Sequence, residues 1–392
     1  MIRILIFDTN FVKGVNRIIV LTKIRYWQKH GCLIDIFCTK EGQKFYSKEL
    51  KDVKYITVNF IYNVNGPYSL PWQLIKLTLK SLKKINNVIG IYDIVYSQSS
   101  VIDFLIIPWL IRKKDKKIKW FVMVDNIVPS PNKRPGPFIQ KLIPFIAFKI
   151  GNCLLNSSDG IFVVTDFLKH YYLNLKMKKV IKTSNGYGID KEIFTGTINL
   201  KTPKTNALYC GRIHHAKGII DMVEVVNLVA SSNQNFKIGI LGDGDAETKK
   251  LFYEKIKKYN LERNFIHLGY KTGKEKGDIY RNSDFFLFLS YDEGCPHAVI
   301  EALACNKLVL AYNLPIYNEI FLKYIQTKQM ILFEKKDYKN IANFIINKIQ
   351  IDKFHFYNKL DDYSWDIISK KELDNFKNEI KNNNNIHNNS NP

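Results

Sequence analysis

The sequence has no cysteine pairs, no long apolar run and fewer acidic than basic residues. Its six cysteines form no C-x-x-C pair and no metal-finger spacing, which argues against the common structural zinc modules and fits a reducing compartment. No apolar run approaches the roughly 20 residues that a membrane-spanning helix needs. The short apolar N-terminus ends at Asp8, too soon for a secretion signal. We therefore expect a cytoplasmic protein, either soluble or peripheral at the inner face of a membrane.

The excess of basic residues lies in the first half of the chain. The formal net charge is +23, and residues 1–200 hold 31 Lys+Arg against 13 Asp+Glu, or +18, which leaves +5 for the remainder. Such a field favours anionic partners: a membrane surface, nucleic acid or a phosphate-bearing substrate. A lysine-rich composition with solvated side chains explains it equally well. A nucleic-acid-binding protein is the least favoured alternative, because no helix-turn-helix, finger or aromatic-basic strand pattern occurs.

Short apolar runs alternate with helical stretches along both halves, which predicts two tandem α/β domains with doubly wound, Rossmann-like parallel sheets. Ligands of such sheets bind beyond the carboxyl ends of the strands, so we expect the two domains to face each other across a ligand cleft. A polar, proline-containing stretch at 200–205 suggests the boundary. The expected parts are a first domain at 1–195, a second at 196–360, a C-terminal helix at 361–380 and a disordered, asparagine-rich tail at 381–392.

The most informative segment carries two glutamates, Glu293 and Glu301, after the apolar run 284–290. Pro296 suits the first position of a helix, where its missing N–H costs nothing. The free N–H groups of Ala298 and Val299 would then meet an anion, most simply a phosphate. A carboxylate on each side of a phosphate site indicates recognition of hydroxyl groups, because an ionised carboxylate only accepts hydrogen bonds.

Two further strand ends carry residues suited to a diphosphate. Gly211 and Arg212 follow the strand at 206–210, and Lys217 opens the next helix. A forked guanidinium with a mobile ammonium can stabilise the charge that grows on a departing diphosphate. Gly242 and Gly244 end the strand at 236–241 and would allow a ligand to approach the backbone. The intervening Asp-Gly-Asp run is expected to form a turn rather than a metal site.

These segments occur in a characteristic order: Gly211-Arg212, Lys217-Gly218, Gly242-Asp-Gly244, Glu293-Gly294 and Glu301-Ala-Leu-Ala304. The order and spacing resemble the nucleotide-sugar domain of retaining glycosyltransferases of family 4, which have the GT-B architecture. Asn185-Gly186 with Asp190 and Phe194 is similar to the segment that joins the two domains in that family. Ser364-Trp365 resembles the start of the helix that crosses back to the first domain.

The resemblance implies a hexosyltransferase that moves sugar from a nucleotide-diphosphate donor to a hydroxyl acceptor with retention, without a metal or cofactor. Arg212 and Lys217 would bind the donor diphosphate, Glu293 would face the sugar, and Glu301 would hold ribose hydroxyls. Other donor-binding positions would be Gly211, Gly242, Gly244, Gly294, Cys295, Pro296, His297 and Ala298. A nucleotide-sugar epimerase of the same shape remains an alternative, although its acid/base set is not apparent.

The acceptor side departs from the family pattern. The usual double-glycine loop is reduced to Lys13-Gly14, and valine replaces the histidine that often precedes the aspartate at Asp125. Asp125 remains a candidate for acceptor activation. A glycan or lipid-linked acceptor is expected on the first domain, where Lys113–Lys117 and the apolar-basic stretch 138–149 could rest on anionic lipid. A core helix with a solvated loop explains those two stretches equally well.

Overall fold

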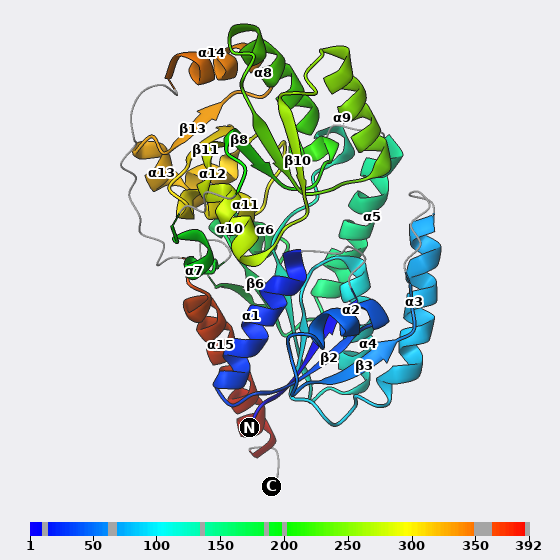
Figure 1. Ribbon diagram of the computed structural model, residues 1–392. Coiled ribbons are helices and arrows are strands. Elements are labelled where there is room, and N and C mark those ends of the chain that lie inside the picture. Colours follow the sequence, from blue (N-terminus) through cyan, green and yellow to red (C-terminus); the bar gives the residue numbers. More distant parts are fainter. Residues whose placement is uncertain are drawn as a thin grey trace. The chain divides into compact units, whose positions relative to one another are not determined.

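The computed structural model describes residues 1–9, 15–61, 69–133, 138–183, 188–197, 202–348 and 363–388. The chain forms two compact units (Figure 1). The first comprises Met1–Pro131, Pro137–Tyr187 and Trp365–Pro392, and the second comprises Asn132–Gly136 and Gly188–Ser364. The units divide before Gly188, earlier than the predicted boundary after residue 195. Ile189 forms a β-bridge with Ser364, which ties this early segment to the second unit.

The first unit contains a seven-stranded parallel sheet in the order β3-β2-β1-β4-β5-β6-β7. The central strands β4 and β6 are buried at every position, as expected where helices cover both faces of a parallel sheet. The strands are β1 (Arg3–Asp8), β2 (Leu33–Thr39), β3 (Lys54–Val58), β4 (Ile94–Ser97), β5 (Lys119–Val124), β6 (Gly160–Val163) and β7 (Val180–Lys182).

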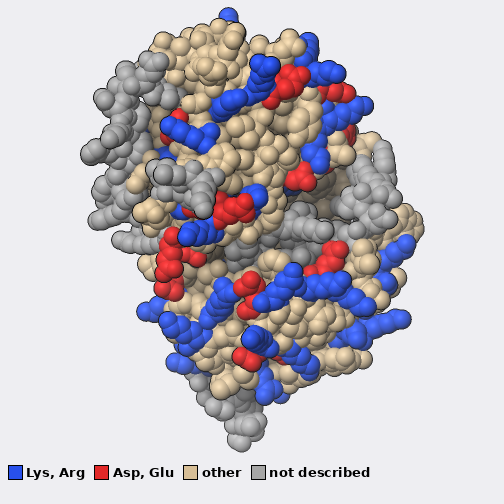
Figure 2. Space-filling model, in the orientation of Figure 1, with Lys and Arg blue, Asp and Glu red and all other residues tan. Residues whose placement is uncertain are grey.

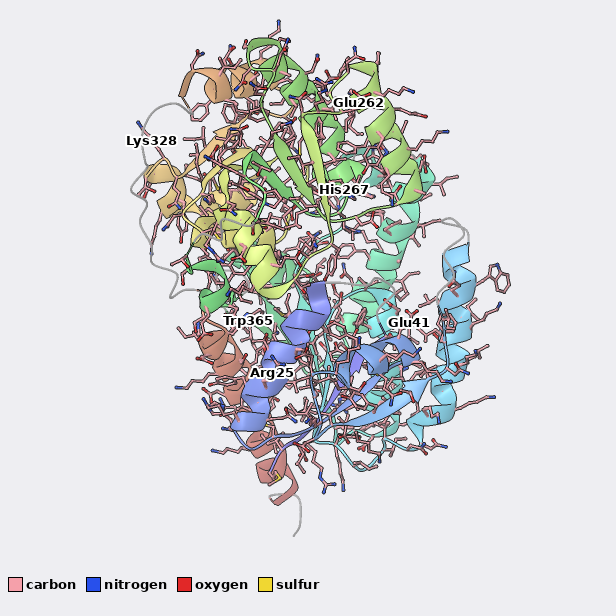
Figure 3. The ribbon with its side chains drawn as sticks, in the orientation of Figure 1. Arg25, Glu41, Glu262, His267, Lys328 and Trp365 are labelled. Atoms are coloured by element: carbon pink, nitrogen blue, oxygen red, sulfur yellow. The ribbon has the colours of Figure 1, made fainter. Side chains whose placement is uncertain are left out.

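The first unit's helices include the C-terminal helix of the chain. They are α1 (Val15–Lys29), α2 (Lys40–Tyr46), α3 (Ser69–Ile85), α4 (Ile106–Lys114), α5 (Phe138–Leu155), α6 (Asp166–Asn174) and α15 (Trp365–Asn388), with 3-10 turns η1 (Ile102–Phe104) and η2 (Pro131–Lys133). Arg25 on α1 and Trp365 at the start of α15 are labelled in Figure 3.

Helix α15 packs against α1 through a buried polar contact. Lys23 Nζ lies 2.7 Å from Glu372 Oε1, and the indole N–H of Trp27 donates to the backbone oxygen of Ser369 at 3.1 Å. The helix continues to Asn388 and so includes 381–388 of the predicted disordered tail. An established helix adds one hydrogen bond per residue at little further cost, and asparagine weakens it only modestly.

The second unit contains a six-stranded parallel sheet in the order β10-β9-β8-β11-β12-β13. Its strands are β8 (Thr205–Cys210), β9 (Ile238–Leu241), β10 (Phe265–Gly269), β11 (Ser283–Phe288), β12 (Leu308–Tyr312) and β13 (Met330–Phe333). Its helices are α7 (Lys191–Phe194), α8 (Ile219–Ser232), α9 (Ala246–Lys258), α10 (Gly273–Arg281), α11 (His297–Ala304), α12 (Pro315–Ile320), α13 (Leu322–Gln326) and α14 (Tyr338–Lys348), with the 3-10 turn η3 (His215–Lys217).

Both sheets confirm the predicted parallel α/β architecture. In the second sheet the chain runs outward from β8 through β9 to β10, then returns to β11 beside β8 and runs outward the other way. The switch point between β8 and β11 is where such sheets open to a ligand. Among the helices of the described residues, none is both long and apolar enough to cross a bilayer.

Candidate functional site

The loops that leave β8 and β11 lie against each other at the switch point of the second sheet. The backbone oxygen of Ala216 accepts hydrogen bonds from the N–H of Tyr291 at 2.9 Å and the hydroxyl of Ser290 at 3.2 Å. Gly218 has φ 64°, and a Cβ there would lie 1.8 Å from the backbone oxygen of Leu289. Only glycine tolerates both the left-handed backbone and this approach, so the sequence fixes the contact between the two loops.

This contact brings Lys217 and Glu293 together from positions 76 residues apart. Lys217 Nζ lies 2.5 Å from Glu293 Oε1, and the two side chains are 18% and 8% exposed. Both residues are predicted donor ligands, and each holds the other in place. An ammonium has three donors, so Lys217 can retain Glu293 and still donate to another oxygen.

Arg212 lies on the same loop as Lys217 but makes no such pair. Its side chain is exposed, and the structure shows no hydrogen bond from its guanidinium to any described residue. Its backbone oxygen accepts from the hydroxyl of Tyr209 at 2.6 Å, which fixes the backbone at this position. The guanidinium therefore remains available to an anion at the edge of the site.

The glycines after β9 serve the packing of two neighbouring loops. A Cβ on Gly242 would lie 2.1 Å from the backbone oxygen of Gly211, and one on Gly244 would lie 1.9 Å from that of Ile213. The N–H of Ile213 also donates to the backbone oxygen of Asp243 at 3.0 Å. The sequence predicts that these glycines allow a ligand to approach the backbone. In the structure it is the backbone of the neighbouring 211–213 loop that approaches them closely.

Helix α11 begins one residue later than expected. Pro296 is its N-cap and His297 its first residue, and the N–H of Val299 donates to the backbone oxygen of Pro296 at 3.0 Å. The expectation of a free N–H at Val299 is therefore wrong, because the first turn closes on Pro296. The N–H of Ala298 has no described acceptor. Of the other predicted positions, Gly294 is buried and Cys295 is half-buried.

Glu301 lies inside the protein, where both of its carboxylate oxygens have polar partners. It is 3% exposed; Oε1 lies 2.5 Å from Lys276 Nζ, and Oε2 accepts from the hydroxyl of Tyr280 at 2.8 Å. Burial by itself would raise its pKa, but Lys276 and His297 outweigh burial and lower the pKa of Glu301 to about 2. Conversely, burial would lower the pKa of Lys276, and the Glu301 carboxylate raises it instead. Both groups are therefore charged at neutral pH.

His297 links Glu301 to the start of the second unit. Its Nδ1 lies 3.2 Å from Glu301 Oε1, and its Nε2 lies 2.9 Å from the backbone oxygen of Gly188. Both neighbours are acceptors, so only the doubly protonated ring can donate to both at once. From the sequence alone His297 is a residue beside the start of a helix, and nothing in the sequence indicated its contact with Glu301.

The sequence analysis missed Lys276 and Tyr280. They lie four residues apart in α10, on one face of that helix, and both meet Glu301. Only their spacing could have suggested a shared partner, and that spacing is common on any helix.

The predicted acceptor-side residues lie in the first unit. Asp125 follows β5 and is half-buried, and its charge raises the pKa of Tyr96 and Tyr172, which burial already raises more strongly. Lys13 and Gly14 lie outside the described residues.

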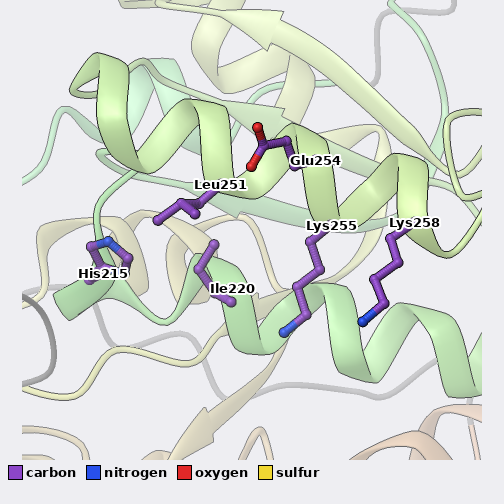
Figure 4. A pocket seen from close by; sticks show the side chains of 6 residues that line it. All are labelled: His215, Ile220, Leu251, Glu254, Lys255 and Lys258. Atoms are coloured by element: carbon purple, nitrogen blue, oxygen red, sulfur yellow. The ribbon is translucent and has the colours of Figure 1, made fainter.

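A surface depression of about 340 Å³ is lined in part by His215, which belongs to the same turn, η3, as Lys217 (Figure 4). Helix α9 supplies most of its lining, and neither Lys217 nor Glu293 contributes. Because neither residue of the Lys217–Glu293 pair lines it, we do not assign the candidate site to it. Its lining residues are His215, Ile220, Leu251, Glu254, Lys255 and Lys258.

The Asp-Gly-Asp run has a structural role. Asp243 pairs with Lys249 at 2.9 Å, and Asp245 caps α9 by accepting from the N–H of Thr248 at 2.7 Å. Across the described ranges, no group of three or more His, Cys, Asp or Glu side chains is placed to hold a metal ion.

Comparison with known proteins finds a family model that matches part of the chain. Residues 190–363 match the family described as Glycosyl transferases group 1. The match covers 174 of the 392 residues and makes this part of the chain similar to that family. The finer resemblance to family 4 stays a prediction.

Curated relatives carry related descriptions over part of their length. The uncharacterized glycosyltransferase MJ1059 of Methanocaldococcus jannaschii is 29% identical over 261 residues, 63% of this chain and 61% of that protein. The capsular polysaccharide biosynthesis glycosyltransferase CapH of Staphylococcus aureus is 26% identical over 166 residues, 42% of this chain and 45% of CapH. The matched region thus spans less than two thirds of either relative.

Solved structures extend the likeness in fold to nearly the whole chain. Sucrose-phosphate synthase from Thermosynechococcus elongatus has a TM-score of 0.75 at 16% identity, over 97% of this chain and all of that one. HepE of Anabaena has a TM-score of 0.63 at 14% identity, over 94% and 93%. At such identities the likeness establishes the fold, that of GT-B glycosyltransferases.

Proposed function

We propose that this protein is a retaining hexosyltransferase that moves a sugar from a nucleotide-diphosphate donor to a hydroxyl group of a glycan or lipid-linked acceptor. The observation that carries the proposal is the Lys217–Glu293 pair at the switch point, on the same loop as the exposed Arg212. It puts a cation next to an acceptor-only group at the edge where such sheets bind ligands.

Sugar transfer requires cations that stabilise the leaving diphosphate and acceptors for the hydrogen bonds of the sugar hydroxyls. When the bond between sugar and phosphate breaks, negative charge grows on the diphosphate, and Arg212 and Lys217 would stabilise it. The N–H of Ala298 at the start of α11 would add a backbone donor. Glu293 would accept hydrogen bonds from sugar hydroxyls while Lys217 holds it in place. We therefore propose that the donor binds to these groups without an added metal.

The nucleoside would extend toward Glu301. Its Oε2 accepts one hydrogen bond from a described residue, Tyr280, and a carboxylate oxygen can accept two. Because Glu301 is ionised and buried, a ribose hydroxyl that reached it would form a strong hydrogen bond. We assign it the ribose on this ground.

The chemistry of the neighbours supports a nucleotide-sugar donor. HepE was solved with UDP and glucose, and the S. aureus protein TarM, with a TM-score of 0.65, was solved with UDP and alpha-GlcNAc-glycerol. CapH is described as acting in capsular polysaccharide biosynthesis. We carry over from these a nucleotide-sugar donor and a glycan-like acceptor. We assign acceptor activation to Asp125 as the sequence suggested, and Lys13 and Gly14 stay predicted acceptor-binding residues.

Titration with UDP and GDP tests the donor site. The substitution Lys217→Ala removes a charge-assisted hydrogen bond worth about 1.5–3 kcal/mol, so we expect diphosphate affinity to fall about 10- to 150-fold. The matched control is Lys255→Ala, since Lys255 pairs with Glu224 at the same 2.5 Å but lies on α9. If both variants bound the nucleoside diphosphate with equal affinity, Lys217 would not be part of the donor site.

Product analysis tests the transfer itself. We expect Glu293→Gln to abolish release of nucleoside diphosphate from a working donor, and wild-type product to keep the donor's anomeric configuration by NMR. An inverted product would contradict retention, and conversion of the donor without transfer would favour the epimerase alternative.

A further inference from the structure

Helix α3 in the first unit presents large apolar side chains to solvent. Trp72 is 68% exposed, Ile75 49%, Leu79 57% and Leu82 39%. Their positions follow a spacing of three, four and three residues, which places all four on one face of the helix. Burial of large apolar side chains is the rule in a soluble unit, and a contiguous exposed stripe marks an interaction site.

The stripe is not the face that holds α3 to the protein. Leu77, Ser81 and Ile85 are buried and form the inner face. At about 100° per residue, the four exposed side chains fall within about 80° of one another, centred opposite Leu77. Helix α3 therefore has two apolar faces, one that packs on the first unit and one that faces outward.

Lysines border the outward stripe on one side. Lys76, Lys83 and Lys84 are exposed, and the same rotation places Lys83 and Lys76 directly beside Trp72. Lys80 instead donates to the backbone oxygen of Asn59 at 2.9 Å. The helix contains no Asp or Glu from Ser69 to Ile85. Figure 2 likewise shows many lysine and arginine side chains and few acidic ones over the first unit.

We propose that helix α3 docks this protein on an anionic membrane surface, with its apolar stripe in the headgroup boundary and its lysines on lipid phosphates. An amphipathic helix with tryptophan and leucine beside lysines has the composition of an interfacial helix. Tryptophan prefers this boundary because its ring is apolar and its N–H polar. A second copy of the chain is a poor occupant, since residues 1–200 alone carry +18 and would repel their like.

This assignment differs from the segments that the sequence suggested. Lys113 of the predicted basic stretch lies over the ring of Trp109 at 4.0 Å, and Lys149 lies over that of Phe145 at 5.5 Å, so both ammonium groups already have a partner. Helix α5 does expose Ile146 and Ile150 and is the competitor to α3. The inference specifies the membrane side of the proposed function, yet its test needs neither donor nor transfer.

Vesicle flotation of the full chain tests the proposal, with neutral phosphatidylcholine vesicles and with vesicles that also contain phosphatidylglycerol. We expect flotation with the anionic vesicles only. Trp72→Ser combined with Leu79→Ser should weaken binding at least tenfold, because each side chain contributes about 1.5–3 kcal/mol when fully buried. Lys76→Glu with Lys83→Glu should also weaken it, by an amount that shrinks as salt rises.

Matched controls test whether loss of binding is specific to α3 or follows from the loss of any exposed apolar or basic side chain. Leu322→Ser changes a leucine that is 47% exposed in the second unit, and Lys257→Glu with Lys274→Glu repeats the charge change there. These controls should float like the unsubstituted chain. Flotation that survives the α3 changes but is lost in Ile146→Ser with Ile150→Ser would overturn the proposal in favour of α5.

Two further outcomes would also overturn the proposal. One is no binding of the unsubstituted chain to anionic vesicles. The other is a dimer in gel filtration that the α3 changes convert to monomer, because a second copy would then cover the stripe. Nucleoside diphosphate titration of the same variants should match the unsubstituted chain, so that loss of docking and loss of the donor site are told apart.

Discussion

The ion pair between Lys276 and Glu301 permits a quantitative test of the second unit's electrostatics. The side chains are 14% and 3% exposed, and removing one partner of such a pair leaves a buried charge without compensation. We expect Lys276→Met to destabilise the second unit by about 3–5 kcal/mol at pH 7. In a Glu301→Gln background the same change should cost little or stabilise the unit, because Lys276 is then itself the buried charge without compensation.

The pH dependence follows from the lowered pKa of Glu301. Its folded value of about 2 lies below the ordinary 4.5, so the carboxylate contributes stability above pH 4.5 that is lost as the pH falls toward 2. The difference corresponds to about 3 kcal/mol, in line with the cost of breaking the pair. In Lys276→Met, burial raises the pKa of Glu301, so the variant should gain stability relative to the unsubstituted chain as the pH falls.

The assay can assign the loss to one unit because the second unit has no tryptophan. Urea unfolding followed by far-ultraviolet circular dichroism reports both units, whereas tryptophan fluorescence reports the first. We expect the substitution to shift the dichroism transition and leave the fluorescence transition in place. An equal cost of Lys276→Met with Glu301 and with Gln at position 301 would refute the reasoning. The tryptophans are Trp27, Trp72, Trp109, Trp120 and Trp365.

Two other structural predictions rest on single contacts. Gly218→Ala should lower the free energy of unfolding by more than about 3 kcal/mol and weaken nucleotide binding. Gly273→Ala should lower it by only about 1–2 kcal/mol, because Gly273 has φ 57° but nothing lies within 4 Å of its Cβ. Equal unfolding midpoints of the two variants in urea would contradict the steric argument. Lys23→Met should destabilise the first unit by about 3–5 kcal/mol in thermal unfolding, because it leaves Glu372 buried without a partner. Adding Glu372→Leu should restore most of the lost stability. If it restored none, the buried ion pair would not be the cause of the destabilisation.

The sequence predicted most of the fold because the strands of a covered parallel sheet are apolar at nearly every position. The predicted strands at 206–210 and 236–241 correspond to β8 and β9, with ends displaced by at most two residues. The strands β7 and β13 were missed. They have three and four residues and lie at sheet edges, and their residues are mostly half-buried, so they lack that apolar signal.

The sequence by itself determined the residue types of the site and the order of its segments, because helix starts, strand ends and glycine turns are local features. Tertiary structure alone decided which charges meet. Lys217 reaches Glu293 because β8 and β11 are neighbours, and Glu301 is enclosed because α10 brings Lys276 and Tyr280 to it. Burial then fixes the protonation of Glu301, and burial depends on every element packed around a group, which no local pattern contains.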